Sequence, residues 1–78
     1  MLQLKNIVMT NGIIYADYIP ESSGDMGTIA FDVKSKKVVE KRLSQMDNIF
    51  PLYFNKAQEW IRNVNLDSLP KERILMWY

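Results

Sequence analysis

The sequence contains neither cysteine nor histidine among its 78 residues. Without cysteine the chain has no disulfide and no thiolate metal ligand, and without histidine it lacks the most common general base. Carboxylate sites for hard cations remain, but we expect no metal, no cofactor and no catalytic residue. Domains of this size often depend on a disulfide, a metal ion or oligomerisation for stability. Of these three, oligomerisation is the one that the composition leaves open.

Long hydrophobic runs are also missing. No stretch approaches the roughly 18 consecutive apolar residues of a membrane span. The start of the chain, MLQLK, lacks the charged region and long apolar run of a signal peptide. Hydrophobic residues make up 47% and charged residues 24% of the chain, as in ordinary globular domains. We therefore expect one cytoplasmic globular domain over residues 1–78, with no membrane partner.

The first half of the chain has the pattern of β-strands, predicted at residues 4–9, 13–19 and 28–33. Asn11-Gly12 stands between the first two and is a strong hairpin signal, because both central residues of a type I′ turn need positive φ. Residues 20–25 have the composition of a loop. Side chains alternate across the second strand, so that Ile14, Ala16 and Tyr18 share one face and Ile13, Tyr15 and Ile19 the other.

A fourth strand is predicted at residues 38–43, after a turn at residues 34–37. Two registers are open for it, since Val39, Lys41 and Leu43 share one face while Val38, Glu40 and Arg42 share the other. The first set has two apolar residues in three and is predicted to face the core.

The hydrophobic period then changes to that of an amphipathic helix. The residues of its apolar stripe are Tyr53, Ala57, Trp60, Ile61 and Val64. The capping signals place the start of the helix anywhere from Ile49 to Lys56. Asn65 is predicted to adopt the left-handed backbone conformation and so to end the helix.

The chain ends ILMWY, although chain termini are poorly ordered unless they dock. Residues 74–78 are therefore predicted to form a final strand. In it Leu75 and Trp77 face one way, and Ile74, Met76 and Tyr78 face the other.

Together these elements predict an α+β fold, an antiparallel sheet of four to five strands with one amphipathic helix packed on one face. A helix about 10 Å wide covers roughly half of a sheet that is about 19–24 Å across. Because two strands are apolar on both faces, we expect a homodimer that buries the second face, although loops 20–26 and 44–52 could cover it instead. The predicted interaction face consists of Tyr15, Ile19, Leu75 and Trp77.

Charge is unevenly distributed. One lysine and four acids give residues 1–33 a net charge of −3, and nine bases and five acids give residues 34–78 a net charge of +4. The bases that could contact single-stranded nucleic acid are Lys34, Lys36, Lys37, Lys41 and Arg42, with Tyr15, Tyr18 or Phe31 stacking on bases. The ordinary interpretation is a solvated turn whose lysines protect an edge strand.

The acidic and hydroxyl side chains match no known site. Glu21 and Asp25 flank Ser22-Ser23-Gly24, with Asp17 and Asp32 near them in sequence, but the spacing fits no calcium loop and no phosphate-binding loop. No histidine is present to activate a hydroxyl, so we expect the protein not to be an enzyme.

The N-terminal hairpin, the hairpin from Val33 through Lys41, the helix and the ending LPKERILMWY resemble short bacterial proteins with an MWY-type C-terminus, a group with no assigned function. The resemblance implies a stand-alone small protein, but no activity, cofactor or functional residue. The leading hypothesis is a non-enzymatic interaction module that self-associates and binds a protein partner, and the alternative is single-stranded nucleic-acid binding.

Overall fold

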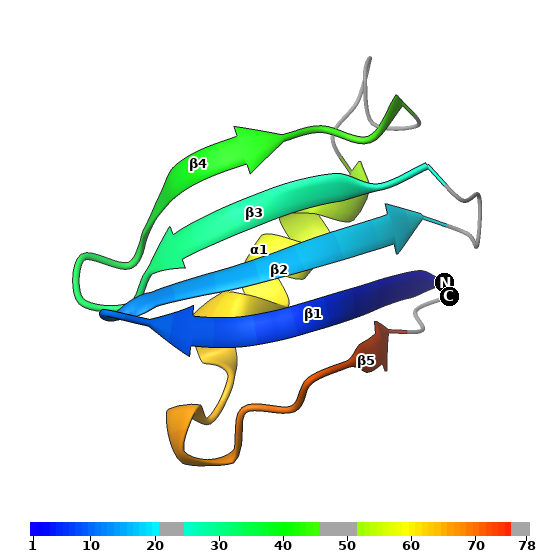
Figure 1. Cartoon of the computed structure of the whole chain (residues 1–78). Helices are drawn as coiled ribbons and strands as arrows, with labels where there is room; N and C mark the ends of the chain where they lie inside the picture. The colour runs from blue at the N-terminus through cyan, green and yellow to red at the C-terminus, as the bar shows by residue number, and fades with distance from the viewer. Residues whose placement is uncertain (21–24, 46–51, 76–78) are drawn as a thin grey trace.

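A computed structural model describes residues 1–20, 25–45 and 52–75. In these ranges the chain forms a five-stranded antiparallel sheet with helix α1 (Leu52–Asn63) packed on one face against β1, β2 and β3 (Figure 1). The strands are β1 (Leu2–Thr10), β2 (Ile13–Pro20), β3 (Gly27–Asp32), β4 (Lys37–Arg42) and β5 (Arg73–Leu75), in the spatial order β4-β3-β2-β1-β5. A short 3₁₀ helix, η2 (Leu66–Ser68), lies between α1 and β5. The predicted α+β class is confirmed.

The hairpin between β1 and β2 turns at Asn11-Gly12 as predicted, with φ of 53° and 78°. A bulge interrupts β1, because the register shifts between Lys5 and Val8 and Asn6 adopts a φ of 54°. Asparagine tolerates this left-handed conformation better than most residues. The extra residue reverses the alternation, so that Ile7 becomes buried and Val8 points away from the helix.

The core lies between α1 and the face of the sheet that it covers. The buried hydrophobic residues of this cluster are Leu2, Leu4, Ile7, Ile14, Ala16, Tyr18, Ile29, Phe31, Phe54, Ala57 and Ile61. The predicted helical stripe is confirmed at Ala57 and Ile61, whereas Tyr53, Trp60 and Val64 are only partly buried. Phe54, which the stripe omitted, is 4% exposed because it lies three residues before Ala57 on the same side of the helix.

Two local predictions are wrong. A second bulge lies in β4, where Phe31 pairs with Val38 and Ala30 with Glu40, so Val39 is the extra residue. Val38 therefore packs against the core and Val39 is 49% exposed, opposite to the prediction. The rest of the predicted register is confirmed, because Lys41 and Leu43 face the helix side and Glu40 and Arg42 the other side. Asn65 does not end α1 in the left-handed conformation, because its φ is −77° and its side chain caps η2 by accepting from the Asp67 N–H.

Among the described residues, no helix has the length and apolarity needed to cross a membrane.

Tyr18 connects three parts of the fold. Its ring is fully buried and meets the Phe54 ring of α1 edge to face, with centroids 5.8 Å apart. Its hydroxyl accepts a 2.9 Å hydrogen bond from the buried Ser44 N–H, just beyond β4. The Ser44 hydroxyl in turn donates to the Asp25 carboxylate at 2.8 Å, just before β3. Tyr18 therefore links the end of β4 to the helix, and Ser44 extends the link to the start of β3.

Gly27 makes room for this ring. It pairs with Tyr18 across β2 and β3, and a β-carbon at this position would overlap the ring and lie 2.7 Å from the Arg42 carbonyl oxygen. Because the obstacles are a buried ring and backbone, neither can move aside at low cost. The position requires glycine for space.

We expect Gly27→Ala to lower the free energy of unfolding by about 2 kcal/mol or more, since added volume in a packed interior forces neighbours apart. Urea unfolding followed by circular dichroism measures the loss. Gly12→Ala is the matched control. Gly12 has a φ of 78° but open space around it, so its loss comes only from backbone strain of about 1 kcal/mol. Equal losses in the two variants would contradict the packing argument.

We expect Tyr18→Phe to lower the free energy of unfolding by about 1–3 kcal/mol, because the buried Ser44 N–H loses its acceptor. The exposed Tyr15 provides the control, since Tyr15→Phe removes the same atom and should change stability by less than about 0.5 kcal/mol. The same urea titration serves both variants, and a Tyr18→Phe protein as stable as the control would show that the hydroxyl is dispensable.

Candidate interaction surface

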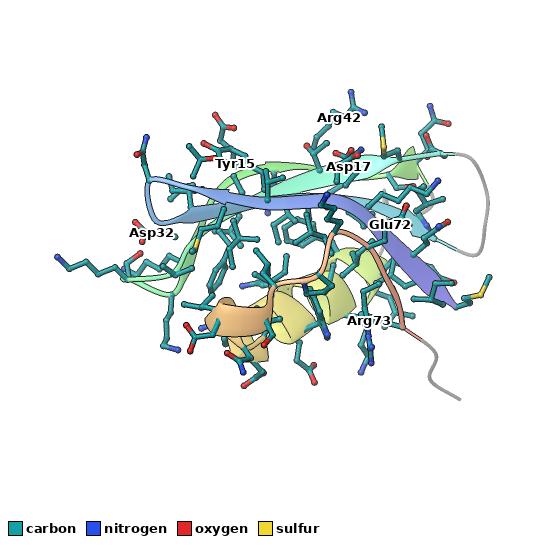
Figure 2. All side chains as sticks on the ribbon, turned by 60° about the horizontal axis from the view of Figure 1, so that its bottom comes forward. Tyr15, Asp17, Asp32, Arg42, Glu72 and Arg73 are labelled. Atoms are coloured by element: carbon teal, nitrogen blue, oxygen red, sulfur yellow. The ribbon has the colours of Figure 1, made fainter. Side chains whose placement is uncertain are left out.

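The face of the sheet opposite α1 is called the open face here. Figure 2 shows Tyr15, Asp17 and Arg42 on this side, with the helix beneath the sheet. The pairing register arranges its side chains in four rows across the strands. The first row is Ile74, Gln3 and Ile19; the second is Lys5, Asp17, Thr28 and Arg42; the third is Val8, Tyr15, Ala30 and Glu40; the fourth is Thr10, Ile13, Asp32 and Lys37.

Large apolar side chains on the open face reach solvent. Val8 is 50% exposed, Tyr15 42% and Ile74 54%. Ile13 and Ile19 are half-buried beside them on β2. Val8 and Tyr15 are direct cross-strand neighbours, so they form one continuous apolar surface rather than isolated positions.

A hollow interrupts the third row at Ala30, the smallest side chain in that row. It encloses about 280 Å³ and is lined by Tyr15, Asp17, Thr28 and Glu40 among others. Asp17 is held at its edge, because its carboxylate accepts a 2.8 Å hydrogen bond from the Asn6 side-chain amide. Asn6 reaches it from the β1 bulge, so the bulge shapes this face as well as the core.

Charges on the open face are balanced. Among the described strand residues, the register gives it the bases Lys5, Lys37 and Arg42 and the acids Asp17, Asp32 and Glu40. A face with three charges of each sign has no excess positive charge to attract phosphates.

Two of the four residues predicted for the interaction face lie on the open face, namely Tyr15 and Ile19. Leu75 does not, because it pairs with Leu2 and packs against the core on the helix side. Its neighbour Ile74 pairs with Gln3 and takes the outward position. Trp77 lies outside the described residues. The prediction joined residues of two strands, and the sequence alone does not show which faces of these strands lie on the same side of the sheet.

The five predicted nucleic-acid contacts divide among three places. Lys34 and Lys36 are exposed in the turn that joins β3 to β4, and Lys37, also exposed, begins β4 and belongs to the open face by register. Lys41 lies on the helix side, with its ammonium 5.7 Å from the Phe54 ring centroid. Arg42 lies on the open face and donates through Nη2 to the Met26 carbonyl oxygen at 3.2 Å.

The aromatic residues predicted to stack on bases are also separated. Tyr18 is fully buried and Phe31 is 2% exposed, so neither ring is accessible. Tyr15 is the one of the three that reaches solvent. The described residues therefore do not combine the basic cluster with a set of stacking rings.

The acidic residues have structural contacts. Asp25 accepts from the Ser44 hydroxyl and from the Gln45 N–H, and Asp32 accepts from the Lys34 N–H at 2.9 Å within the β3–β4 turn. Glu21 lies outside the described residues. No group of three potential metal ligands occurs in the part of the chain that the structure describes.

Sequence reasoning missed Val8 as a member of this surface, and it did not align Glu40 and Arg42, which it placed on the outward side of their strand, with Tyr15. Each bulge changes the alternation of its strand, and the bulge in β4 has no distinctive residue pattern. The one available signal was Asn6, a residue type that favours left-handed backbone in the middle of a predicted strand.

Comparison of the chain with protein-family models, with curated proteins and with solved structures found no match.

Because its bases are divided, we expect the protein to bind a labelled single-stranded oligonucleotide no more tightly than about 100 µM at near-physiological salt, the weak end of non-specific binding. Fluorescence polarisation measures this. Micromolar binding that weakens steeply with salt, and that a Lys34→Ala, Lys36→Ala, Lys37→Ala triple variant loses, would instead support a nucleic-acid interface at the turn.

Proposed function

We propose that the protein is a cytoplasmic, non-enzymatic interaction module that forms a homodimer through its open face and binds a protein partner. The observation that carries this proposal is the exposure of Val8, Tyr15 and Ile74 on one regular, hydrogen-bonded surface. Val8 and Tyr15 adjoin, and Ile74 lies on the same face beyond the row that contains Lys5 and Asp17. Large apolar side chains exposed together on one face of a small domain usually mark an interaction site.

The small size of the domain supports the same conclusion. A core made by one sheet and one helix stabilises a chain of 78 residues only modestly. Burying a large apolar side chain contributes roughly 1.5–3 kcal/mol. Covering the exposed side chains of the open face would therefore add stability comparable with a substantial part of the net free energy of folding.

The chemistry of the face favours protein over nucleic acid. Its charges balance, and its exposed ring is a tyrosine, a residue type enriched at protein interfaces. A protein partner with an apolar sheet face or strand would contact the same side chains. Self-association and partner binding would then compete, so the dimer would be the resting form.

We expect Tyr15→Thr and Val8→Thr each to weaken the dimer at least about tenfold, since both remove apolar area from the face while threonine, a β-branched residue, still favours the strand. Leu66→Ser is the matched control, because Leu66 is 43% exposed but lies in η2, away from the open face. Sedimentation velocity over a concentration series gives the dissociation constant.

Thermal unfolding of each variant shows whether the fold is retained. A wild-type protein that stays monomeric at about 100 µM would contradict the proposal, as would a control variant that weakens association as much as Tyr15→Thr.

A further inference from the structure

We propose that the second copy packs on the open face about a two-fold axis that runs across the strands, so that Glu40 of each copy faces the partner's Arg42. This inference rests on the proposed homodimer and adds its geometry. It follows from the order of charges and apolar residues in the four rows.

A two-fold axis that relates two facing sheets must lie parallel to them. An axis across the strands, between the second and third rows, exchanges those two rows and also exchanges the first with the fourth. Glu40 then meets the partner's Arg42 on β4. On β2, Ile13 meets the partner's Ile19, and on β3, Ala30 meets the partner's Thr28.

This arrangement places opposite charges together at the β4 edge and Ile13 against the partner's Ile19 on β2. Between them on β2, Tyr15 meets the partner's Asp17, whose carboxylate the phenol hydroxyl can reach as a hydrogen-bond donor. The small Ala30 leaves the hollow of about 280 Å³ that can receive the partner's Thr28. Lys5 meets the partner's Val8, where its aliphatic stem can cover the valine while its ammonium stays in water. By register, no like charges are opposed in the second and third rows.

The other central axis runs along the strands, between β2 and β3. It would place Lys5 against the partner's Arg42, which opposes two positive charges. It would also place Glu40 against the partner's Val8, so that this carboxylate would lose water without gaining a base. Like charges across an interface cost several kcal/mol, so the row pattern selects the axis across the strands.

The open face is small compared with a specific protein interface, so the two copies must overlap over the whole face. The molecule measures 30 × 21 × 20 Å, so a flat side of it offers at most about 600 Å². Specific interfaces bury about 600–1,000 Å² per partner. An axis displaced to one side of the face would leave part of this area uncovered, whereas an axis through its centre uses all of it. Aligned sheet packing allows this overlap.

Arg42 is positioned for the contact. Its guanidinium donates one hydrogen bond to the Met26 carbonyl oxygen at 3.2 Å, which holds the group on the open face. Four further N–H donors remain for the partner's carboxylate. Because the axis is two-fold, each dimer contains this Glu40–Arg42 contact twice.

Charge reversal tests the geometry. We expect Glu40→Arg and Arg42→Glu each to raise the dimer dissociation constant at least about tenfold, because each creates two like-charge contacts per dimer. The double variant, Glu40→Arg with Arg42→Glu, restores opposite charges and should return to within about threefold of wild type. Matched controls are Glu59→Arg on α1 and Lys34→Glu in the β3–β4 turn, both exposed and away from the open face.

Sedimentation equilibrium at one fixed ionic strength gives all six dissociation constants, and circular dichroism melts confirm folding. A monomeric wild type would overturn both the homodimer and its geometry. A dimeric wild type whose single reversals match the controls, or whose double variant stays as weak as the singles, would keep the homodimer and overturn this geometry. The proposed geometry is supported when both single reversals weaken the dimer and the double variant restores it.

Discussion

The burial of Tyr18 is the constraint on which the rest of the structure depends. Its ring fills the space between β2 and α1, touches Phe54, and excludes any side chain at Gly27. Since side chains alternate along a strand, an inward Tyr18 directs its neighbours on β2 outward. The inward position of Tyr18 is therefore the reason that Tyr15 and Asp17 lie on the solvent side of β2. The composition of the open face follows from the packing of the opposite face.

Two bulges complete that surface at its sides. In β1 the extra residue at Asn6–Ile7 turns Val8 to the open face beside Tyr15, and Asn6 itself holds Asp17. In β4 the extra residue Val39 lets Val38 pack on the core while Glu40 and Arg42 remain outward. Each bulge thus lets its strand place apolar side chains in the core on one side while its other side chains stay aligned with the rows of the open face. Both bulges also bend strands near the sides of the sheet, where bulges are common.

Much of the fold could be predicted from sequence because its signals are local. Asn11-Gly12 specifies a hairpin by its backbone requirement, and the spacing of Ala57 and Ile61 specifies a helix face. The position of Leu75 could not be predicted in this way. Its orientation depends on pairing with Leu2, more than 70 positions away in the chain, and a shift of one residue reverses it. The bulge at Val39 was hidden because valines at 38 and 39 satisfy either register equally well.

The candidate surface was predictable only in part for the same reason. Tyr15 and Ile19 follow from alternation within one strand, whereas the rows that join Val8, Glu40 and Arg42 to them exist only after four strands are aligned. The basic residues predicted to form one site do not lie together, because residues adjacent in the sequence of a strand point to opposite sides of the sheet. Lys41 turned toward Phe54 and Arg42 toward the open face because they are consecutive residues of one strand.

The central claim is that the open face is buried in solution by a second copy. Amide chemical shifts recorded by two-dimensional NMR across a dilution series from about 1 mM to 10 µM test it directly. The account predicts concentration-dependent shifts at Tyr15, Asp17, Ala30 and Glu40, with no change on the exposed side of α1 at Glu59 and Asn63. A spectrum that does not change with concentration, or changes centred on α1, would contradict it.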